Sequence, residues 1–300
     1  MSTPLVDFSQ ELANTVERAG QSVISILEGG RAGVSGTVWR KGIAIAVAHT
    51  IHSLDEVTVI LPSGAEAKAA VTAHDSGTDL AILQLPQDLA SASLGDDSKV
   101  RIGEIVLSIG RRGTEGLAAS HGIVSAIGGP WRTSTGARVD RWLRLDLNPF
   151  SGFSGGPIIN AGGEVLGIAT SGPRRSAAVV PASTVNRVVD QLLKYGRTVR
   201  GYIGVGLQPV AFPEDAWKTL GINSGRGLLI TAIAPGSAAE EAKLTLGDVI
   251  VTIEGETLRP GAGLQWLLDA ETVGKSISVG VFRGGQLLSV PVTVREKPAE

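Results

Sequence analysis

The spacing of apolar and polar positions predicts that most of this chain forms short strands. Between about residue 23 and residue 180, apolar residues come in short β-branched runs that glycines separate. Many short strands at this spacing are typical of an all-β barrel or sandwich. The runs that we expect to form strands are 35–39, 43–47, 57–61, 80–85, 105–109, 123–127, 142–145, 165–170 and 177–180.

Two segments carry helical spacing instead. The first predicts a helix over 7–18, capped by Asp7 and stopped by Gly20, because its apolar residues recur on one stripe. That stripe consists of Phe8, Leu12 and Val16. The second helix precedes Gly196, a natural terminator, and its apolar residues match the i, i+3, i+4, i+7, i+8 template. They are Val185, Val188, Val189, Leu192 and Leu193.

A second, smaller β-rich unit follows a short hinge expected at 197–200. Its predicted strands are 202–207, 227–233, 248–253, 276–282 and 287–294. It also contains two short helical patterns, one starting at Ser237 with Glu240 in a capping box and one around 264–268. The organisation predicts three parts, which are an N-terminal helix or extension over 1–20, a β domain over 21–198 and a smaller α+β domain over 199–300.

Composition and charge exclude several classes of protein. The 300 residues include 27 Lys plus Arg, 29 Asp plus Glu, four His and no Cys. Without Cys there is no disulfide, thiolate zinc site, iron–sulfur cluster or cysteine nucleophile. The nearly balanced charge predicts no nucleic-acid binding. A membrane-spanning helix needs about 20 apolar residues, and the best run, 42–48, is far shorter, so no membrane span is expected.

The strongest candidate for chemistry is Ser154, which lies in a glycine-rich turn before the strand-like residues 158–159. Flanking glycines allow an exposed hydroxyl beside backbone N–H groups that face a developing oxyanion, and the expected donors are Gly152 and Ser154. An ordinary β-turn is the alternative. A serine also needs a base and an orienting carboxylate. His49 follows one predicted strand and Asp79 precedes another, and the order His, Asp, Ser occurs in chymotrypsin-like double barrels.

These stretches together resemble the HtrA/Deg family of trypsin-like serine proteases with one C-terminal PDZ domain. The resemblance covers residues 20–300 and includes segments 36–39, 78–83, 94–96, 106–110, 122–126, 154–157, 163–168 and 200–205. It implies a chymotrypsin-like double β-barrel followed by a small α+β PDZ domain. It also implies that Ser154 is the nucleophile, His49 the general base and acid, and Asp79 the orienting acid, while Gly152 supplies an oxyanion N–H.

The family's activity and partners follow as expectations. The resemblance implies an ATP-independent serine endopeptidase, without cofactor, that degrades unfolded or misfolded polypeptides. Residues Ile203, Gly204 and Val205 resemble the PDZ loop that binds a peptide C-terminus. A homotrimer or higher oligomer is expected, with the N-terminal helix as a candidate contributor. No basic leader precedes an apolar run, so the chain is interpreted as cytoplasmic if it is full length and periplasmic if it has been trimmed.

Several residues near the predicted site have open interpretations. Thr170 has two interpretations. Its hydroxyl is expected either to donate to Asp79 and keep that carboxylate ionised, or to have no such role, because threonine is also common in strands. Where the family usually carries Asn-Pro-Gly-Asn, residues 150–153 read Phe-Ser-Gly-Phe, and Phe153 is expected to reshape the rim of the specificity pocket. That pocket is expected to prefer small or medium apolar side chains. Residues 171–175 are expected to line the substrate-binding cleft.

Other polar clusters have weaker cases. His52, His74 and His121 are interpreted as partly buried or surface imidazoles, and no metal site is expected. Four arginines precede the nucleophile segment and are interpreted as solvated charges, with an anion contact or a sensor surface as alternatives. They are Arg132, Arg138, Arg141 and Arg144.

One alternative function belongs to a different class. A protease-like fold held inactive would act as a peptide-binding chaperone or scaffold through its PDZ domain. The complete set of His49, Asp79 and Ser154 argues against this interpretation, because a chain that had lost its activity would be expected to lose at least one of the three.

Overall fold

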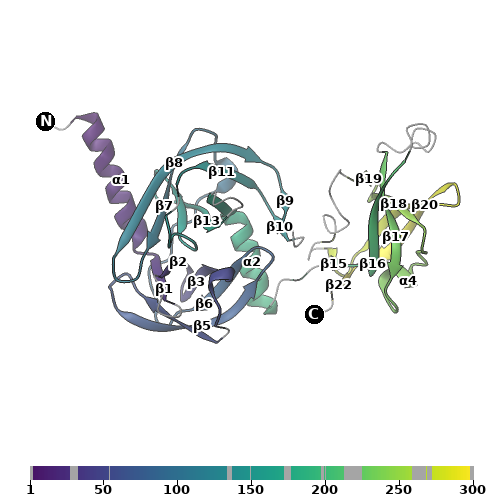
Figure 1. Ribbon diagram of the computed structural model, residues 1–300, viewed down its shortest axis with the longest axis horizontal. Helices are drawn as coiled ribbons and strands as arrows, with labels where there is room; N and C mark the ends of the chain where they lie inside the picture. Colours follow the sequence, from purple (N-terminus) through teal and green to yellow (C-terminus); the bar gives the residue numbers. More distant parts are fainter. Residues whose placement is uncertain are drawn as a thin grey trace. The chain divides into compact units, whose positions relative to one another are not determined.

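The structure is a computed structural model. It describes residues 3–27, 33–53, 55–133, 137–148, 150–171, 177–196, 199, 201–212, 225–258, 268 and 272–297. The chain divides into two compact units, Met1–Thr198 and Val199–Glu300. Figure 1 labels many of their elements. Each unit has its own hydrophobic core.

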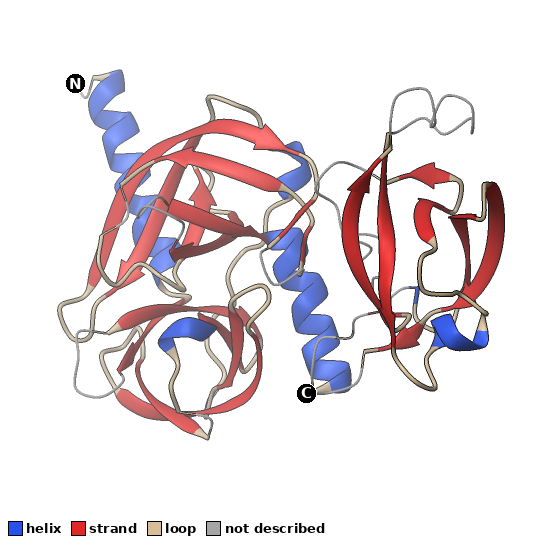
Figure 2. Ribbon diagram, turned by 45° about the vertical axis from the view of Figure 1, so that its right-hand side comes forward, coloured by secondary structure: helices blue, strands red, loops and turns tan. Residues whose placement is uncertain are grey.

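The first unit contains a closed six-stranded barrel whose strands follow the order β1-β2-β3-β6-β5-β4. Figure 2 shows this barrel nearly end on. Its strands are β1 Val23–Leu27, β2 Val34–Arg40, β3 Ile43–Val47, β4 Glu56–Ile60, β5 Glu66–Asp75 and β6 Leu80–Gln84. All pairs are antiparallel.

A second six-stranded sheet follows, in the order β11-β8-β7-β12-β13-β14. Its strands are β7 Ile105–Arg111, β8 Leu117–Gly128, β11 Trp142–Asp146, β12 Pro157–Asn160, β13 Val165–Ser171 and β14 Ala177–Pro181. Shorter elements around the two sheets are η1 Ala48–Thr50, η2 Asp97–Lys99, β9 Trp131–Arg132 and β10 Arg138–Val139. The two barrel-like sheets confirm the mostly β, double-barrel fold class.

Strand alternation assigns residues of the first barrel to two different cores. Along β3, Ala44 and Ala46 face the barrel interior, whereas Ile43, Ile45 and Val47 join the cluster between the two sheets. Because successive side chains of a strand point to opposite faces, both faces are buried here. A strand that is buried on both faces reads as a continuous apolar run, which explains why the sequence predicts β3 with its observed bounds.

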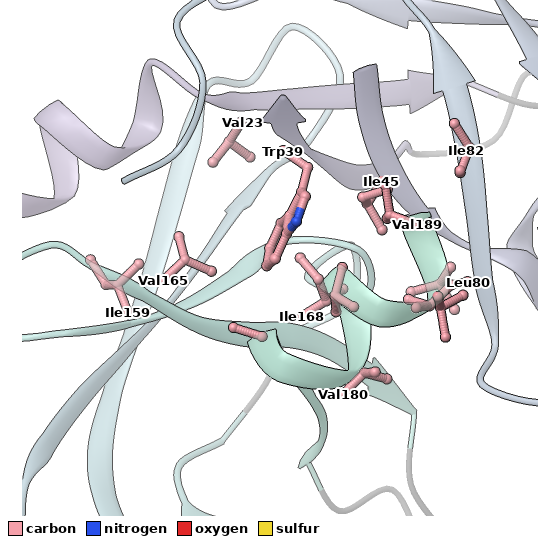
Figure 3. Close-up of a cluster of buried hydrophobic side chains, with 14 of the residues drawn as sticks. Val23, Trp39, Ile45, Leu80, Ile82, Ile159, Val165, Ile168, Val180 and Val189 are labelled. Carbon is pink, nitrogen blue, oxygen red and sulfur yellow. The ribbon is translucent and has the colours of Figure 1, made fainter. Parts of the chain in front are cut away.

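The core between the sheets is closed by helix α2, Ala182–Tyr195. Figure 3 shows Trp39 of β2 directed into this cluster, among residues from both sheets and from α2. Its indole Nε1 donates to Asn186 Oδ1 of α2 at 2.8 Å. Gly196 ends α2 in the left-handed conformation, as its sequence predicts.

The first helix, α1, spans Pro4–Gly20 and starts before the predicted position. The prediction that Asp7 caps it is wrong, because Thr3 is the N-cap residue and no side chain bonds the cap. Pro4 occupies the first turn, where its fixed φ suits a helix and its missing N–H costs nothing. Leu12 and Val16 pack on the core, whereas Phe8 lies on the exposed N-terminal half, which extends away from the sheets in Figure 1.

Strand β5 has no counterpart among the strands predicted from the sequence. One of its faces is exposed, and polar residues therefore alternate with apolar ones along Glu66–Asp75. Its apolar residues are mostly alanine, which is depleted in strands. The sequence signal for this strand is therefore weak, although its pairing with β4 and β6 is needed to close the barrel.

The second unit is a small sheet with the order β16-β17-β18-β20-β21. Its elements are β15 Gly201–Tyr202, β16 Val205–Ala211, β17 Arg226–Ile233, α4 Ala238–Glu241, β18 Val249–Ile253, β19 Glu256–Thr257, β20 Ser276–Arg283, β21 Gln286–Thr293 and β22 Arg295–Glu296. Ser237 caps α4 by accepting from Glu240 N, and Glu240 reaches back to Gly236 N. This confirms Ser237 as the cap, although Glu240 accepts from Gly236 N and not from Ser237 N as a capping box requires.

One strand prediction in this unit is wrong. The predicted strand 202–207 is broken, because β15 ends at Tyr202, β16 starts at Val205 and Ile203 and Gly204 lie between them. Gly204 has a φ of +85°, which interrupts the extended backbone. The helix expected around 264–268 and the hinge expected at 197–200 fall outside the described residues, apart from Leu268 and Val199. Among the helices that the structure describes, none has the length and apolar character needed to cross a bilayer.

Candidate functional site

Strand register brings His49 and Asp79 together. In the antiparallel pair β3–β6, Val47 lies opposite Leu80, so the residues just after β3 meet the residue just before β6. The backbone continues this pairing, because Ala48 N donates to Asp79 O at 3.0 Å. The side chain of Asp79 therefore lies beside η1, which carries His49.

Asp79 holds the imidazole of His49 through two contacts. Asp79 Oδ1 accepts from His49 N at 2.9 Å, and Asp79 Oδ2 lies 2.8 Å from His49 Nδ1. A carboxylate accepts hydrogen bonds, so this contact favours the His49 tautomer that carries its proton on Nδ1 and leaves Nε2 as an acceptor. The His49 side chain is about half exposed, at 48%, which leaves the ring accessible to a substrate.

Thr170 joins this pair from the second sheet. Its Oγ1 donates to Asp79 Oδ2 at 2.7 Å, which is the first of the two interpretations that the sequence leaves open for Thr170. Because Thr170 lies on β13 and Asp79 precedes β6, the bond links the two sheets. The carboxylate is thus fixed from both sides.

Asp79 has an unusual backbone conformation, with a φ of +62°. Most residues avoid this left-handed region, although Asp and Asn tolerate it better than others. The preceding turn holds the conformation in place, because the buried carboxylate of Asp75 accepts from Gly77 N, Thr78 N and Thr78 Oγ1 at 3.2, 3.0 and 2.7 Å. Asp75 is a residue that the sequence reasoning missed.

Ser154 lies in a tight turn over residues 150–156, called the Ser154 turn below. Gly152 and Gly155 both have positive φ, +95° and +86°, as the predicted use of glycine there requires. A Cβ at Gly155 would lie 2.0 Å from Ser35 O, so only glycine fits. Within the described part of the chain, Gly152 N–H has no hydrogen-bond acceptor, and this N–H is the first predicted oxyanion donor.

The turn is joined to the His49–Asp79–Thr170 group through β13. Gly155 N donates to Ala169 O at 2.8 Å, and Ala169 N donates to Gly156 O at 2.9 Å. Ala169 immediately precedes Thr170, which contacts Asp79. Strand β13 therefore contacts the Ser154 turn through Ala169 and the carboxylate of Asp79 through Thr170.

The two phenylalanines of the turn have different environments. Phe153 is fully buried, and its ring fills the space where a Cβ on Gly110 would lie. It packs edge to face with Phe150, with ring centroids 5.7 Å apart. The expectation that Phe153 reshapes a pocket rim is wrong, because its ring is fully buried against Gly110 of β7. Phe150 is the exposed aromatic residue of this loop.

Ser35 and Thr37 of β2 also contact the turn, and sequence reasoning missed both. Ser35 Oγ donates to Gly152 O at 2.6 Å, and Thr37 Oγ1 donates to Gly155 O at 2.9 Å. The available signal was a pair of hydroxyl residues at alternate positions of a strand that is otherwise expected to be core. Both side chains are fully buried.

The remaining predicted clusters lie apart from these contacts. Arg138 pairs with Asp140 at 2.9 Å, and Asp140 also accepts from Arg187, so part of the arginine cluster is already paired within the protein. Arg144 is exposed on β11. His74 and His121 lie on β5 and β8. Of the residues expected to line the cleft, 172–175 are outside the described part of the chain.

In the second unit, Ile203 and Gly204 lie between β15 and β16, and their carbonyl groups accept hydrogen bonds from the same domain. Ala239 N donates to Ile203 O and Ala234 N donates to Gly204 O, both at 2.8 Å. In a trans peptide the C=O and N–H groups point in opposite directions. The N–H groups of Gly204 and Val205 therefore point away from these donors. A Cβ at Gly204 would lie 2.2 Å from Ser237 Cβ, which requires glycine.

Comparisons with known families agree with this arrangement. Residues 34–168 match the family model of the trypsin-like peptidase domain, and residues 201–294 match that of the PDZ domain.

Two relatives illustrate the sequence similarity. The first is a protein of Brucella suis biovar 1 (strain 1330), named a probable periplasmic serine endoprotease DegP-like. It is 32% identical over 266 residues, which cover 86% of this chain and 51% of that protein. The second, from Haemophilus influenzae, is named a probable periplasmic serine protease do/HhoA-like. It is 30% identical over 254 residues, which cover 82% of this chain and 54% of that protein. The chain spans about half the length of the curated relatives it matches.

Solved structures extend the similarity over nearly the whole chain. The HtrA-type protease AlgW with tripeptide is 26% identical, with a TM-score of 0.78, and the match covers 96% of this chain and 98% of that one. The serine endoprotease from Yersinia pestis is 25% identical, with a TM-score of 0.73, and the match covers 99% and 100% of the two chains.

Proposed function

Because the chain belongs to the HtrA family of serine proteases, with a trypsin-like peptidase domain followed by one PDZ domain, we propose that it is a serine endopeptidase. One observation carries the proposal. The exposed imidazole of His49 is fixed by Asp79, and Thr170 connects that carboxylate to the strand that holds the Ser154 turn.

In the proposed mechanism, Ser154 attacks the scissile carbonyl while His49 Nε2 takes the hydroxyl proton. Asp79 keeps the imidazole in the tautomer that has Nε2 free, and it stabilises the imidazolium that forms. His49 then gives the proton to the leaving amine, which produces an acyl-enzyme. Water attacks the acyl group with His49 again as the base, and the peptide acid is released.

The oxyanion that forms during each attack is assigned to the backbone N–H groups of Gly152 and Ser154. Donors placed in advance at the developing charge contribute strongly to catalysis, because they need no reorganisation during the reaction. The open N–H of Gly152 and the positive φ at that residue support this assignment.

We further propose unfolded or misfolded polypeptides as substrates, with cleavage after small or medium apolar side chains. Segment 148–151 contains no acidic or basic residue that would select a charged side chain. The mechanism needs no ATP and no cofactor, because protein side chains and backbone supply every group it uses.

The PDZ domain is proposed to bind the C-terminus of a peptide at residues 203–205 and thereby to regulate cleavage. Outward N–H groups in succession form a concave anion site, and a peptide can add as a strand beside it. Titration with one peptide in free-acid and C-terminally amidated forms tests this role. Weaker binding of the amide is expected, and equal affinity would remove carboxylate capture from the proposal.

Two properties of the whole protein are also proposed. We propose a homotrimer, the usual assembly in this family, and a periplasmic location, since the relatives named above are called periplasmic. Fractionation of cells that make the native protein, followed by N-terminal sequencing, tests the location. Recovery of the protein in the cytoplasmic fraction would contradict it.

The endopeptidase proposal is tested with unfolded casein as substrate and a fluorophosphonate probe. Wild-type protein is expected to cleave casein and to become labelled, whereas Ser154→Ala does neither. Cleavage by Ser154→Ala at the wild-type rate would refute the assignment of Ser154. If wild-type protein neither cleaves nor becomes labelled, with peptide activators present, the chaperone or scaffold interpretation replaces the enzyme.

A further inference from the structure

We propose that Ser35 and Thr37 are positioning residues that hold the Ser154 turn in its catalytic shape. The inference rests on the proposed endopeptidase function and adds two side chains to it. Neither hydroxyl is placed to touch a substrate or to transfer a proton. Both act on the backbone that carries the nucleophile and the oxyanion donors.

The placement follows from strand geometry. Ser35 and Thr37 are two residues apart on β2, so both point to the same face. That face is opposite the barrel interior, which contains Val38, and it is turned toward the second sheet. Both side chains have 0% exposure, so their hydroxyls need partners within the protein.

Ser35 holds the first half of the turn. Arg111 N donates to Ser35 Oγ at 2.9 Å. A hydroxyl has only one proton to donate, and with its acceptor side occupied by Arg111, the Ser35 hydroxyl directs that proton to Gly152 O at 2.6 Å. This bond restrains ψ of Gly152, the residue whose N–H is the first oxyanion donor.

Thr37 and the β2 backbone hold the second half. Thr37 Oγ1 donates to Gly155 O at 2.9 Å, and Ser35 N donates to Ser154 O at 3.0 Å. Three successive contacts from one strand therefore reach the carbonyls of Gly152, Ser154 and Gly155. They lie on both sides of the nucleophile.

The turn needs such contacts because of its composition. Glycine populates both signs of φ, so Gly152 and Gly155 give the turn more conformations than any other residue type would. Each conformation that turns the Gly152 N–H away from the oxyanion removes a donor. Removal of one such donor lowers kcat by about 10²–10³ in a serine protease.

The second sheet does not supply these restraints by itself. Ala169 bonds Gly155 N and Gly156 O, which fixes the end of the turn that leads into β12. The Gly152 carbonyl is fixed by Ser35. Ser35 therefore restrains the part of the turn that β13 does not reach, and Thr37 adds a second restraint at Gly155, whose N–H is bonded to β13.

The variants that test the inference are Ser35→Ala, Thr37→Val and Thr37→Ser. Ser108→Ala is the matched control, because Ser108 is also a fully buried strand serine and its Oγ has no hydrogen-bond partner within the described part of the chain. Val keeps the branched shape of Thr without the hydroxyl, and Ser keeps the hydroxyl. Measurements are kcat and KM with labelled casein, the rate of fluorophosphonate labelling, the thermal unfolding midpoint, and hydrogen exchange of the amides in residues 150–156.

We expect Ser35→Ala and Thr37→Val to lower kcat and the labelling rate by about tenfold or more, with KM within about twofold of wild type. Amides of the turn should exchange faster in both variants. Thr37→Ser should recover kcat to within about twofold, as should Ser108→Ala. A purely structural role would instead lower the unfolding midpoint and leave kcat of the folded enzyme unchanged.

The inference is overturned if both Ser35→Ala and Thr37→Val have the same kcat as the control, Ser108→Ala. If Ser35→Ala does not fold, the comparison of Thr37→Val with Thr37→Ser decides it. If wild-type protein shows neither cleavage nor labelling, the proposed function fails separately. Hydrogen exchange then decides the positioning role, because equal exchange in Ser35→Ala and Ser108→Ala would refute it and faster exchange in Ser35→Ala would support it.

Discussion

Asp79 has its backbone in the left-handed region, at a φ of +62°, a conformation that costs a residue other than glycine free energy. The bonds around it explain why the conformation persists. Asp75 fixes the turn on one side, while His49 and Thr170 fix the carboxylate on the other. Such over-determined strain is typical of functional sites, and it agrees with the role proposed for Asp79.

The prediction at the scale of single residues concerns the glycines of the Ser154 turn. We expect Gly155→Ala to abolish casein cleavage, because the new Cβ would lie 2.0 Å from Ser35 O and would push β2 and the turn apart. Gly64→Ala is the matched control, since Gly64 also has positive φ but faces open space. In the control, the unfolding free energy should fall by only about 1–2 kcal/mol, which is the cost of placing alanine in the left-handed region.

Urea unfolding and casein cleavage measure both variants. Gly155→Ala should lose more unfolding free energy than Gly64→Ala, together with its activity. Wild-type activity in Gly155→Ala would show that the turn tolerates a side chain at this position and would contradict the packing described here.

At the scale of elements, strand β2 contacts both helix α2 and the Ser154 turn. Trp39 bonds Asn186 of α2, Arg40 pairs with Asp190 of the same helix, and Ser35 reaches the Ser154 turn. The two contacts with α2 differ in environment. Trp39 is 1% exposed, whereas the Asp190 side chain is 63% exposed.

This difference in burial predicts that two substitutions in α2 lower the unfolding free energy by different amounts. Asn186→Ala leaves the buried indole N–H without its acceptor and should lower the unfolding free energy by about 1–3 kcal/mol. Asp190→Ala removes an exposed ion pair and should cost less than about 1 kcal/mol. Urea unfolding measures both. An equal or larger loss in Asp190→Ala would contradict the assignment.

A second prediction at this scale concerns the start of β18. Burial alone raises the pKa of Asp248, but hydrogen bonds from Arg283 and Thr245 outweigh it and lower that pKa below its ordinary value. The Arg283 fork bonds both carboxylate oxygens at 2.6 Å. A carboxylate with a lowered folded pKa stabilises the protein above its unfolded pKa, and this contribution is lost as pH falls through the folded pKa.

Asp248→Asn should therefore lower the unfolding free energy of the second unit at neutral pH by about 1–3 kcal/mol and reduce its loss of stability in acid. Hydrogen exchange of β18 and β20 amides between about pH 7 and pH 3 follows this unit. Glu241→Gln, which removes a more exposed ion pair with Arg295, is the control and should change little. An acid dependence in Asp248→Asn as steep as in wild type would contradict the prediction.

At the scale of the whole molecule, each unit has a core of its own, and the exposed apolar residues of α1 remain without a partner in the described chain. Leu5, Val6 and Phe8 are exposed on the first turns of this helix. The proposed homotrimer would cover them, since large apolar side chains gain free energy when they leave water.

This proposal predicts that Phe8→Glu converts the trimer to monomers. Leu287→Glu is the matched control, because Leu287 is 47% exposed and Phe8 is 45% exposed. Sedimentation equilibrium measures the molecular mass of both variants. A trimer that survives Phe8→Glu would exclude Phe8 from the subunit contact, and a monomeric wild-type protein would refute the trimer itself.

The local sequence pattern was sufficient to predict several strands, the Ser154 turn and the candidate triad of this protein. Strands that are buried on both faces form continuous apolar runs, so β3, β6 and β13 could be located from sequence to within a residue of their bounds. Glycine at positions 152 and 155 also indicated where the backbone turns, because side chains disfavour the conformations found there. The candidate triad followed from residue types and their order along the chain.

Contacts between distant segments needed the tertiary structure. Strand β5 carries a weak local signal and exists because β4 and β6 need it to close the barrel. Ser35 and Thr37 belong to common residue types with no signature of their own, and their partners in the Ser154 turn lie 117 and 118 positions away. The fold alone decides which buried hydroxyl meets which carbonyl, because strand register and sheet packing set those distances. Sequence pattern therefore identified the residues proposed to react, and the fold identified those that hold them in place.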